Sequence, residues 1–457
     1  MPAIPEFELK CNEILMKSGL IDSFLQQEGE FLGHGWDELF IRAKKLLKIE
    51  DDGVLRGILL KQMFYRRATL HMEEGDYDEA INNFTTLIEF FPEYHTGYEA
   101  RAECYCEMER YLEAINDFSA AIKLYPEWSP FYIRRADMKK ETGYPEWAMA
   151  DYNRAIKKNP DFAAGYYSRG RLKVDLEDYT GALKDFNKAL SLGYKEEYIY
   201  EYRAVCKVSF NDFKGALNDL EQALKLDDYN LKARITRAEL LKNLDRLDDA
   251  YEDYLIITRQ APAFALPFFE LAVICYERGN LPEAKKYIAR ATELEEEEPD
   301  YFNLSGLIHM GTEKYGKAVS EFNKALELDP ENPDILCNLA EACVRLGHFH
   351  KASGILRRVK KLNPDYADYY YVSAQICFAM KNPEMAIRHC SRALEIDPEY
   401  GHALYLRGLV KLSAGDWQGG EDDLTAAFYI KYPDADYSAM IKKLIEREKK
   451  RVKTLSD

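Results

Sequence analysis

The sequence lacks the features by which several classes of protein are recognised. It contains no run of about eighteen apolar residues, so no segment is predicted to cross a membrane. Its first residues, MPAIPEFELKCNEILMKSG, lack the basic segment and apolar core of a secretory leader, and we expect no leader. The nine cysteines are odd in number and scattered, which indicates reduced thiols in a cytoplasmic protein rather than a disulfide framework.

Positive charge is also in deficit. The chain has 62 lysines and arginines against 79 aspartates and glutamates, a formal net charge of −17 at pH 7. Such an excess of negative charge repels phosphate backbones and anionic lipid surfaces. We therefore expect neither a nucleic acid nor a membrane as the partner.

The usual signatures of catalysis and metal binding are missing too. There is no glycine-rich phosphate loop, no nucleophile elbow and no paired CxxC or HExxH spacing. The histidines gather only in GHFH (347–350) and RHC (388–390), and the run LEEEEPD (294–300) lacks the alternating oxygen ligands of a calcium loop. We expect no enzymatic activity, no metal and no cofactor.

What the sequence does contain is a repeat. The segment YDEAINNF (77–84) returns 34 residues later as YLEAINDF (111–118). When residue 61 is numbered as position 1 of a 34-residue copy, position 20 is alanine in ten consecutive copies, from Ala80 to Ala386, and Gly420 in the eleventh. Position 8 is alanine or glycine in all eleven, and position 32 is proline in seven. No insertion interrupts the phase from Lys61 to Asp434.

Each copy is predicted to form a helical hairpin. Apolar residues recur at three- and four-residue spacing in two runs, which indicates two amphipathic helices bent near position 15. Small residues at positions 8 and 20 allow the two helix axes to approach closely. Proline at position 32 ends the second helix. The predicted fold is therefore all-α, an α-solenoid of stacked hairpins.

This pattern resembles the tetratricopeptide repeat, which has a 34-residue period, a small residue at position 8, alanine at 20, an aromatic residue at 24 and proline at 32. The chain departs from the family at position 7, where leucine is usual and arginine predominates here. The resemblance implies a right-handed superhelix whose first helices line a concave groove. It also implies a non-enzymatic scaffold that binds a peptide or protein segment in that groove.

The repeat phase divides the chain into three regions. Residues 1–60 are predicted to be an N-terminal helical cap, and residues 435–457 a C-terminal capping helix and tail with Met440, Ile441 and Leu444 facing inward. Between them lie the eleven predicted copies, 61–94, 95–128, 129–162, 163–196, 197–230, 231–264, 265–298, 299–332, 333–366, 367–400 and 401–434.

The arginines at position 7 are predicted to form structural ion pairs. Positions 7 and 23 are equidistant from a bend at position 15, so their side chains can face each other across the hairpin. Six copies combine arginine at 7 with aspartate at 23, which favours pairing over a ladder of ligand-facing arginines. The predicted pairs are Arg101–Asp117, Arg135–Asp151, Arg169–Asp185, Arg203–Asp219, Arg237–Asp253 and Arg407–Asp423.

The resemblance places the groove at about positions 2, 5, 9 and 12 of each copy. These positions carry mixed charge in copies two to six, and many are apolar or aromatic in copies seven to eleven. Packing between repeats and ligand binding both remain open for this second set. The candidates are Leu266, Phe269, Val273, Tyr276, Leu307, Met310, Tyr371, Phe378, Tyr405 and Leu409.

The charge beside these candidates indicates the kind of partner. Acidic residues border the set without matching lysines or arginines at groove positions, which favours a peptide with apolar anchors and a few basic residues. These acids are Asp300, Asp334, Glu341 and Asp368.

Other partners fit less well. Co-chaperones of the family that hold the tails of Hsp70 and Hsp90 use lysine at 5 and asparagine at 9 of their first repeat, where this chain has Tyr65 and Thr69. An Hsp70 or Hsp90 tail is therefore not expected. An RNA-binding helical-repeat protein is disfavoured by the acidity and the paired arginines, and a regulatory subunit of a separate enzyme stays open. The sequence does not give the oligomeric state.

Overall fold

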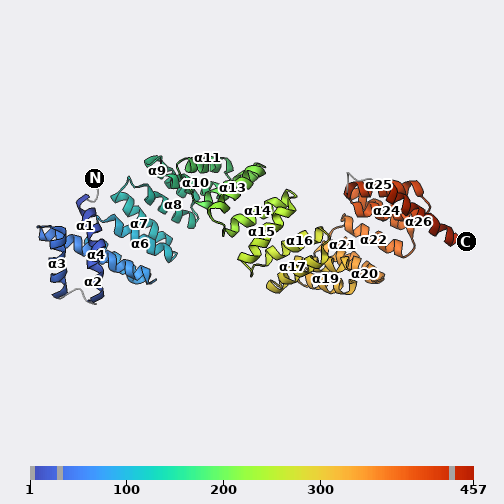
Figure 1. The fold of residues 1–457 in the computed structure, drawn as a ribbon, viewed down its shortest axis with the longest axis horizontal. Coiled ribbons are helices and arrows are strands. Elements are labelled where there is room, and N and C mark those ends of the chain that lie inside the picture. The colour runs from blue at the N-terminus through green and yellow to red at the C-terminus, as the bar shows by residue number, and fades with distance from the viewer. Residues whose placement is uncertain (1–5, 28–33, 432–437, 457) are drawn as a thin grey trace. The chain divides into compact units, whose positions relative to one another are not determined.

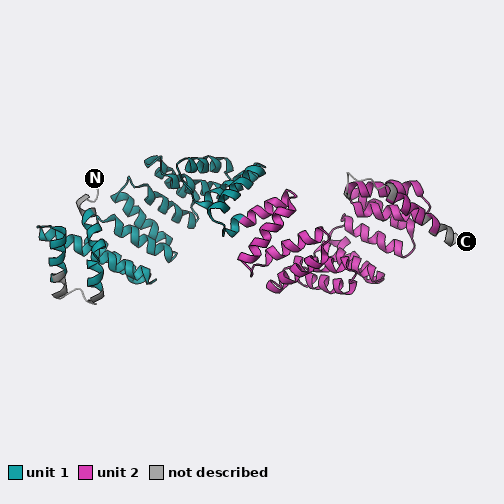
Figure 2. Ribbon diagram, viewed as in Figure 1, with its two compact units in different colours: residues 1–233 teal, residues 234–457 magenta. Residues whose placement is uncertain are grey.

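The computed structural model describes residues 6–27, 34–431 and 438–456. These residues form 26 α-helices and, within those ranges, no β-strand (Figure 1). The predicted all-α helical-repeat solenoid is confirmed. The chain divides into two compact units, residues 1–233 (unit 1) and 234–457 (unit 2), and the division falls within helix α14 (Leu231–Asn243) (Figure 2).

Four helices pack together at the start of unit 1. They are α1 (Glu6–Ser18), α2 (Leu20–Gln27), α3 (His34–Leu47) and α4 (Asp52–Glu73). Their shared core includes Leu15, Leu39 and Leu55. Helix α4 begins before residue 61 because Asp51 caps it, its carboxylate accepting hydrogen bonds from the backbone N–H groups of Gly53 and Val54. It therefore belongs both to the N-terminal helices and to the first hairpin.

From the second copy on, each first helix begins at the first residue of its predicted copy and spans thirteen residues. Besides α14, these helices are α6 (His95–Glu107), α8 (Ser129–Glu141), α10 (Ala163–Asp175), α12 (Glu197–Ser209), α16 (Ala265–Glu277), α18 (Pro299–Gly311), α20 (Pro333–Arg345), α22 (Ala367–Ala379) and α24 (Gly401–Ser413).

Each second helix begins at position 17 of its copy. Apart from the helices next to α14, it packs against the first helix of its own copy and, where one follows, the first helix of the next. These helices are α5 (Tyr77–Phe90), α7 (Tyr111–Leu124), α9 (Pro145–Lys158), α11 (Tyr179–Ser191), α13 (Phe213–Leu226), α15 (Leu247–Gln260), α17 (Leu281–Leu294), α19 (Tyr315–Leu328), α21 (Phe349–Leu362), α23 (Pro383–Ile396) and α25 (Trp417–Lys431).

The turn inside every hairpin depends on one left-handed residue. Position 15 has a positive φ in all eleven copies and is glycine in five of them. In the other six it is a residue with a side chain, held at φ between 56° and 60°, as in Glu177 and Lys381. A left-handed residue with a Cβ costs roughly 1–2 kcal/mol. The turn is thus imposed by packing of the two helices and not by glycine alone.

Close helix contact inside the hairpins comes from small residues. The alanines at position 20 are fully buried in all ten copies that have one. In the eighth copy Gly306, at position 8, lies so near Phe322 that a Cβ there would stand 2.4 Å from the ring. The predicted role of positions 8 and 20 therefore agrees with the packing.

The last helix, α26 (Ser438–Ser456), covers the end of unit 2. Ile441 and Ile445 are buried against the final hairpin and Leu444 is partly buried there, whereas Met440 is 47% exposed. The prediction that Met440 faces inward is therefore wrong, because the stripe formed by 441, 444 and 445 leaves it at the edge. Residues 435–437 of the predicted cap lie outside the described residues.

Two glycines of the ninth copy test the turn. Gly347 occupies position 15 with φ 76°, whereas Gly354 lies within α21 with helical geometry and room for a Cβ. We expect Gly347→Ala to lower the free energy of unfolding by about 1 kcal/mol and Gly354→Ala to raise it by about 0.5–1 kcal/mol. Urea and thermal denaturation of the full chain measure both. Shifts of the same sign would contradict a left-handed requirement at position 15.

Candidate functional site

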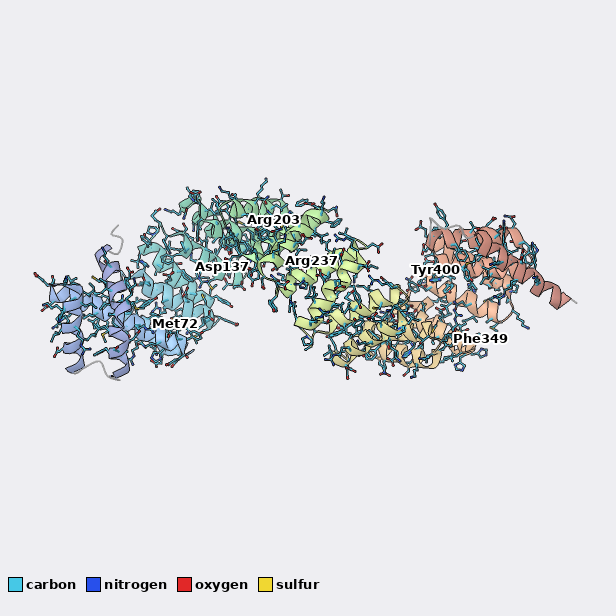
Figure 3. The ribbon with its side chains drawn as sticks, in the orientation of Figure 1. Met72, Asp137, Arg203, Arg237, Phe349 and Tyr400 are labelled. Atoms are coloured by element: carbon cyan, nitrogen blue, oxygen red, sulfur yellow. The ribbon has the colours of Figure 1, made fainter. Side chains whose placement is uncertain are left out.

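All six predicted arginine–aspartate pairs are close in the structure. Each arginine donates from Nε and Nη2 to the two carboxylate oxygens of the aspartate at position 23 of its own hairpin, over 2.5–2.8 Å. This two-bond geometry fixes direction as well as distance. Arg203 and Arg237 are labelled in Figure 3. The arginine side chains are therefore engaged within the fold.

The same arginines also join neighbouring copies. In five copies the arginine Nη1 donates a hydrogen bond to a polar side chain at position 25 of the preceding copy. The sequence analysis did not predict these bonds. The bonds are Arg101 to Thr85 (2.9 Å), Arg135 to Ser119 (3.0 Å), Arg169 to Asn153 (2.7 Å), Arg203 to Asn187 (2.9 Å) and Arg407 to Ser391 (3.1 Å).

A lysine at position 11 completes four of these sites. Its ammonium lies 2.7–2.8 Å from the aspartate at position 23. Lysine occurs at position 11 in four of the eleven copies, and each of these copies also has arginine at 7 and aspartate at 23. That co-occurrence was the signal that could have identified the four lysines, Lys139, Lys173, Lys207 and Lys411.

Two of the aspartates show the electrostatic effect of this arrangement. Burial alone would raise the pKa of Asp151, but hydrogen bonds and charge from Arg135 and Lys139 outweigh it and lower that pKa. Asp423 has a lowered pKa for the same reason, with Arg407 and Lys411 as its partners. The cations thus stabilise the carboxylate form within the hairpin.

Copies seven to ten replace this ionic cluster. Positions 7 and 23 are Leu271 and Tyr287, Ser305 and Glu321, Leu339 and Ile355, and Ser373 and His389 in these copies. In the ninth copy, Leu339, Cys343 and Ile355 fill positions 7, 11 and 23, and all three are buried. The chain therefore contains two kinds of hairpin, ionic and non-ionic.

The ten predicted groove candidates form what we call the aromatic face of unit 2. Nine are half-buried and Tyr405 is exposed. Several also pack against the core: Phe269, Val273 and Tyr276 contact one buried cluster, Leu307, Met310 and Tyr371 another, and Leu409 the C-terminal one. These side chains therefore contribute to packing between repeats while part of their surface remains accessible.

Ring contacts connect parts of this face. Phe269 stacks on Tyr301 at 4.8 Å between centroids, and Tyr405 meets Phe428 edge-on at 6.0 Å. Tyr371 lies 5.4 Å from Tyr400. Tyr400, labelled in Figure 3, was not predicted, because it lies at position 34, outside the first helix.

The predicted acids lie beside the aromatic face. Asp300, Asp334 and Asp368 occupy position 2 of three successive copies. Burial raises the pKa of Asp334, and the negative charges of Asp368 and Asp300 raise it further. The hydroxyl of Tyr400 donates to Asp368. Like charges are therefore close enough at this border to affect one another.

Glu341 is the fourth acid. It accepts a hydrogen bond from Gln375 (3.1 Å), and its charge acts on Tyr276 and Tyr371, so that side chains of α16, α20 and α22 converge near it. Burial, with a smaller contribution from Glu341, raises the pKa of Tyr371 to about 12. Arg345, on the same helix, lies 3.5 Å from Glu341. Arg345 is at position 13 and therefore not at one of the predicted groove positions, so the expectation for those positions stays a prediction.

Neither a metal centre nor a membrane span is found in the part of the chain that the structure describes. No three histidine, cysteine, aspartate or glutamate side chains there are arranged to hold a metal ion. Among the same residues, no helix has the length and apolar character needed to cross a bilayer.

Family comparisons agree with this repeat architecture. Models described as "Tetratricopeptide repeat" match residues 65–127, 145–197, 269–333, 309–376 and 367–400, together more than half of the chain. The last range coincides with the tenth predicted copy. The chain belongs to the tetratricopeptide-repeat family. No curated protein matches it significantly.

Solved structures of similar proteins include other members of the family. YrrB, described as a TPR protein with an unusual peptide-binding site, is 26% identical over 43% of this chain and 97% of its own, with a TM-score of 0.37. Yeast Tom70 is 16% identical over 87% and 97%, with a TM-score of 0.39. A chain of the APC/C hetero-tetramer Cut9–Hcn1 is 14% identical over 88% and 95%, with a TM-score of 0.42.

The ninth copy shows which residues can replace the ionic cluster of the third copy, which consists of Arg135, Lys139 and Asp151. We expect Asp151→Ile alone to destabilise the chain by about 3–5 kcal/mol, because the half-buried cations Arg135 and Lys139 lose their fully buried partner. Changing Arg135→Leu and Lys139→Cys as well installs the set Leu339, Cys343 and Ile355, and should recover most of that loss. Thermal denaturation of the single and triple variants measures the recovery. Asp161→Ala, an exposed control, should change little.

The pH dependence of the same variants has a defined sign. The folded chain lowers the pKa of Asp151, so the carboxylate contributes stability above its unfolded pKa of about 4. That contribution is lost as the pH falls through the lower, folded pKa. The stability gap between the original chain and Asp151→Ile should therefore narrow at acid pH. A gap that stays constant would show that ionisation is irrelevant to the cluster.

Proposed function

We propose that this protein is a non-enzymatic interaction scaffold and that the aromatic face of unit 2 binds a peptide segment with apolar anchors and basic residues. The observation that carries the proposal is the crowding of Asp300, Asp334 and Asp368 beside that face. Family membership supports the general role, because stacked helical repeats offer extended surfaces for protein partners. The aromatic side chains and the acids supply two complementary kinds of contact.

The acidic row is not explained by helix stability alone. Each of the three aspartates lies in the first turn of its helix, where negative charge is favoured by the helix dipole. Helices α16 and α24 of the same unit have no acid in their first turn, so the fold does not demand one. Burial raises the cost of ionising Asp334, and the negative charges of Asp368 and Asp300 raise it further. A bound lysine or arginine would offset that cost.

The aromatic face supplies the apolar anchors. A half-buried ring keeps a fixed orientation and still has surface that a ligand can cover, which is how a few aromatic residues come to dominate binding energy. Tyr405 is the most exposed of the set, and its ring meets that of Phe428 edge-on. Tyr371 packs against the core and against Tyr400, so its removal would disturb the fold as well as the face.

We also place the protein in a reducing compartment, the cytoplasm. None of the nine cysteines is joined in a disulfide, and seven of them are buried. Burial raises the pKa of Cys104 and of Cys390 to about 12, so these thiols are protonated and unreactive at neutral pH. The buried thiols act as small apolar side chains in the core.

Asp334→Asn tests whether ionisation of Asp334 lowers the stability of the fold. Because the folded chain raises the pKa of Asp334, ionisation destabilises the fold. The penalty is absent below the ordinary aspartate pKa of about 4 and complete above the raised one. We expect the variant to be more stable at pH 7 by up to about 0.5 kcal/mol and to match the original chain at acid pH. Thermal denaturation against pH measures this, with Glu297→Gln, in an exposed turn, as the control.

The binding proposal is tested with a phage-displayed library of random dodecapeptides, selected on the full chain and followed by synthetic peptides. Peptides that combine aromatic or aliphatic residues with lysine or arginine should be enriched. Their affinity should fall about tenfold in Asp334→Asn/Asp368→Asn and become less salt-dependent, because two attractive charges are gone. Glu296→Gln/Glu297→Gln removes the same charge from an exposed turn and should leave binding unchanged. Failure to enrich such peptides, or equal binding to both double variants, would refute the proposal.

A further inference from the structure

Unit 1 contains an arginine whose surroundings differ from those of all the position-7 arginines. Arg171 is the one basic residue at position 9 in the eleven copies. Its guanidinium lies 5.7 Å from the ring centre of Tyr167, on the same helix α10, and 5.4 Å from that of Tyr202, on the next first helix α12. Two aromatic faces therefore hold the group in a fixed position.

This arginine is not neutralised by an ion pair. Among the described residues, no carboxylate comes within 4.0 Å of its nitrogens, and its Nε is buried without a hydrogen-bond partner. Its electrostatic neighbours are Tyr202, with which it also makes a side-chain hydrogen bond, then Tyr167 and Asp137. The arginines of the six ionic clusters each have a bidentate aspartate, as Arg203 does. Because the Nε of Arg171 is buried, the donors that remain for a group from outside are on its terminal nitrogens.

A buried acceptor lies on the same face. Glu201 is 4% exposed, and one of its oxygens accepts a hydrogen bond from the side-chain amide of Asn230 at 2.5 Å. The other oxygen, Oε2, is buried and has no hydrogen-bond partner in the described chain, with the ammonium of Lys232 3.7 Å away. An unbonded buried carboxylate oxygen costs free energy unless a donor reaches it.

The two groups share aromatic neighbours. Tyr167 is affected by both Arg171 and Glu201. The ring of Tyr202 lies 5.2 Å from the ammonium of Lys232 as well as next to Arg171. The face thus alternates in charge along successive copies, from Asp137 (labelled in Figure 3) through Arg171 and Glu201 to Lys232.

We propose that this face is a second peptide site, in which Arg171 binds a carboxylate of the ligand and Oε2 of Glu201 accepts a neighbouring N–H. The carboxylate is an aspartate or glutamate side chain or a C-terminus. The planar guanidinium matches a carboxylate with two parallel hydrogen bonds. Asp137 and Glu201 beside it disfavour a dianionic phosphate, which would be repelled more strongly than a single carboxylate.

This site is independent of the aromatic face. It lies in unit 1, and it selects a ligand charge of the opposite sign. The same geometry would also suit a purely structural role, in which Arg171 only packs on the two tyrosines. The distinguishing property is discrimination between a carboxylate and its amide, because stacking alone gives no preference between them.

The experiment uses the same dodecapeptide library on the full chain, with variants Arg171→Gln and Arg171→Lys. The matched control is Arg154→Gln, which removes an exposed arginine of unit 1 whose partner Asp151 keeps two other cations. Peptides depleted by Arg171→Gln should contain aspartate or glutamate, or depend on a free C-terminus. Their synthetic Asp→Asn or C-terminally amidated forms identify which carboxylate binds.

We expect the original chain to prefer the carboxylate form by about tenfold or more, the loss typical of a charged hydrogen bond. The preference should vanish in Arg171→Gln, shrink in Arg171→Lys and persist in Arg154→Gln. It should also persist in Asp334→Asn/Asp368→Asn, which separates this site from the aromatic face. An undiminished preference in Arg171→Lys, or no acidic class depleted by Arg171→Gln, overturns the proposal. Should Arg171→Gln fail to fold, the Arg171→Lys result decides.

Discussion

Every hairpin of this protein depends on two helices meeting at a small buried residue. The alanine at position 20 has no exposed surface in any of its ten copies, and the residue opposite it in the first helix is alanine or glycine. A larger side chain would separate the helices and move every contact beyond them. The left-handed residue at position 15 follows from this constraint, because the chain must reverse within a few residues to bring the helices so close.

The ionic clusters are built on that close contact. Positions 7 and 23 face each other because the helices meet at fixed register, so an arginine and an aspartate placed there find bidentate geometry in six copies. The non-ionic copies keep the same backbone with leucine or serine at position 7 and tyrosine, glutamate, isoleucine or histidine at position 23. The repeat therefore tolerates both chemistries, provided that no charge is left without a partner. The first-helix side chains that point away from the second helix do not take part in this contact, so their residue types can differ between the two units.

The sequence predicted the features that arise within a single copy and missed the contacts between neighbouring copies. The 34-residue phase predicted the residue at which helices such as α22 begin. The equal distance of positions 7 and 23 from the bend at position 15 predicted the partner of Arg101. The bond from Arg101 to Thr85 was missed, because it joins separate copies and has no signal within one period. Glu177 was not identified as left-handed, since packing and not residue type imposes that φ. Helical spacing selected the residues of the aromatic face but could not separate surface from core for half-buried residues such as Tyr371.

The backward bond from position 7 to position 25 also determines how this chain could grow or shrink by whole copies. A 34-residue block from copies two to four contains both the donor and the acceptor, so tandem duplication of the block recreates the junction at each new boundary. Blocks from copies seven to ten have no arginine at position 7 and join through apolar contacts. An ionic block placed after copy seven or nine would have Ala289 or Arg357 at position 25 and so lack an acceptor for its arginine, whereas copy ten supplies Ser391 to Arg407. The order of the copies is therefore constrained chemically, even though all share one length and one backbone.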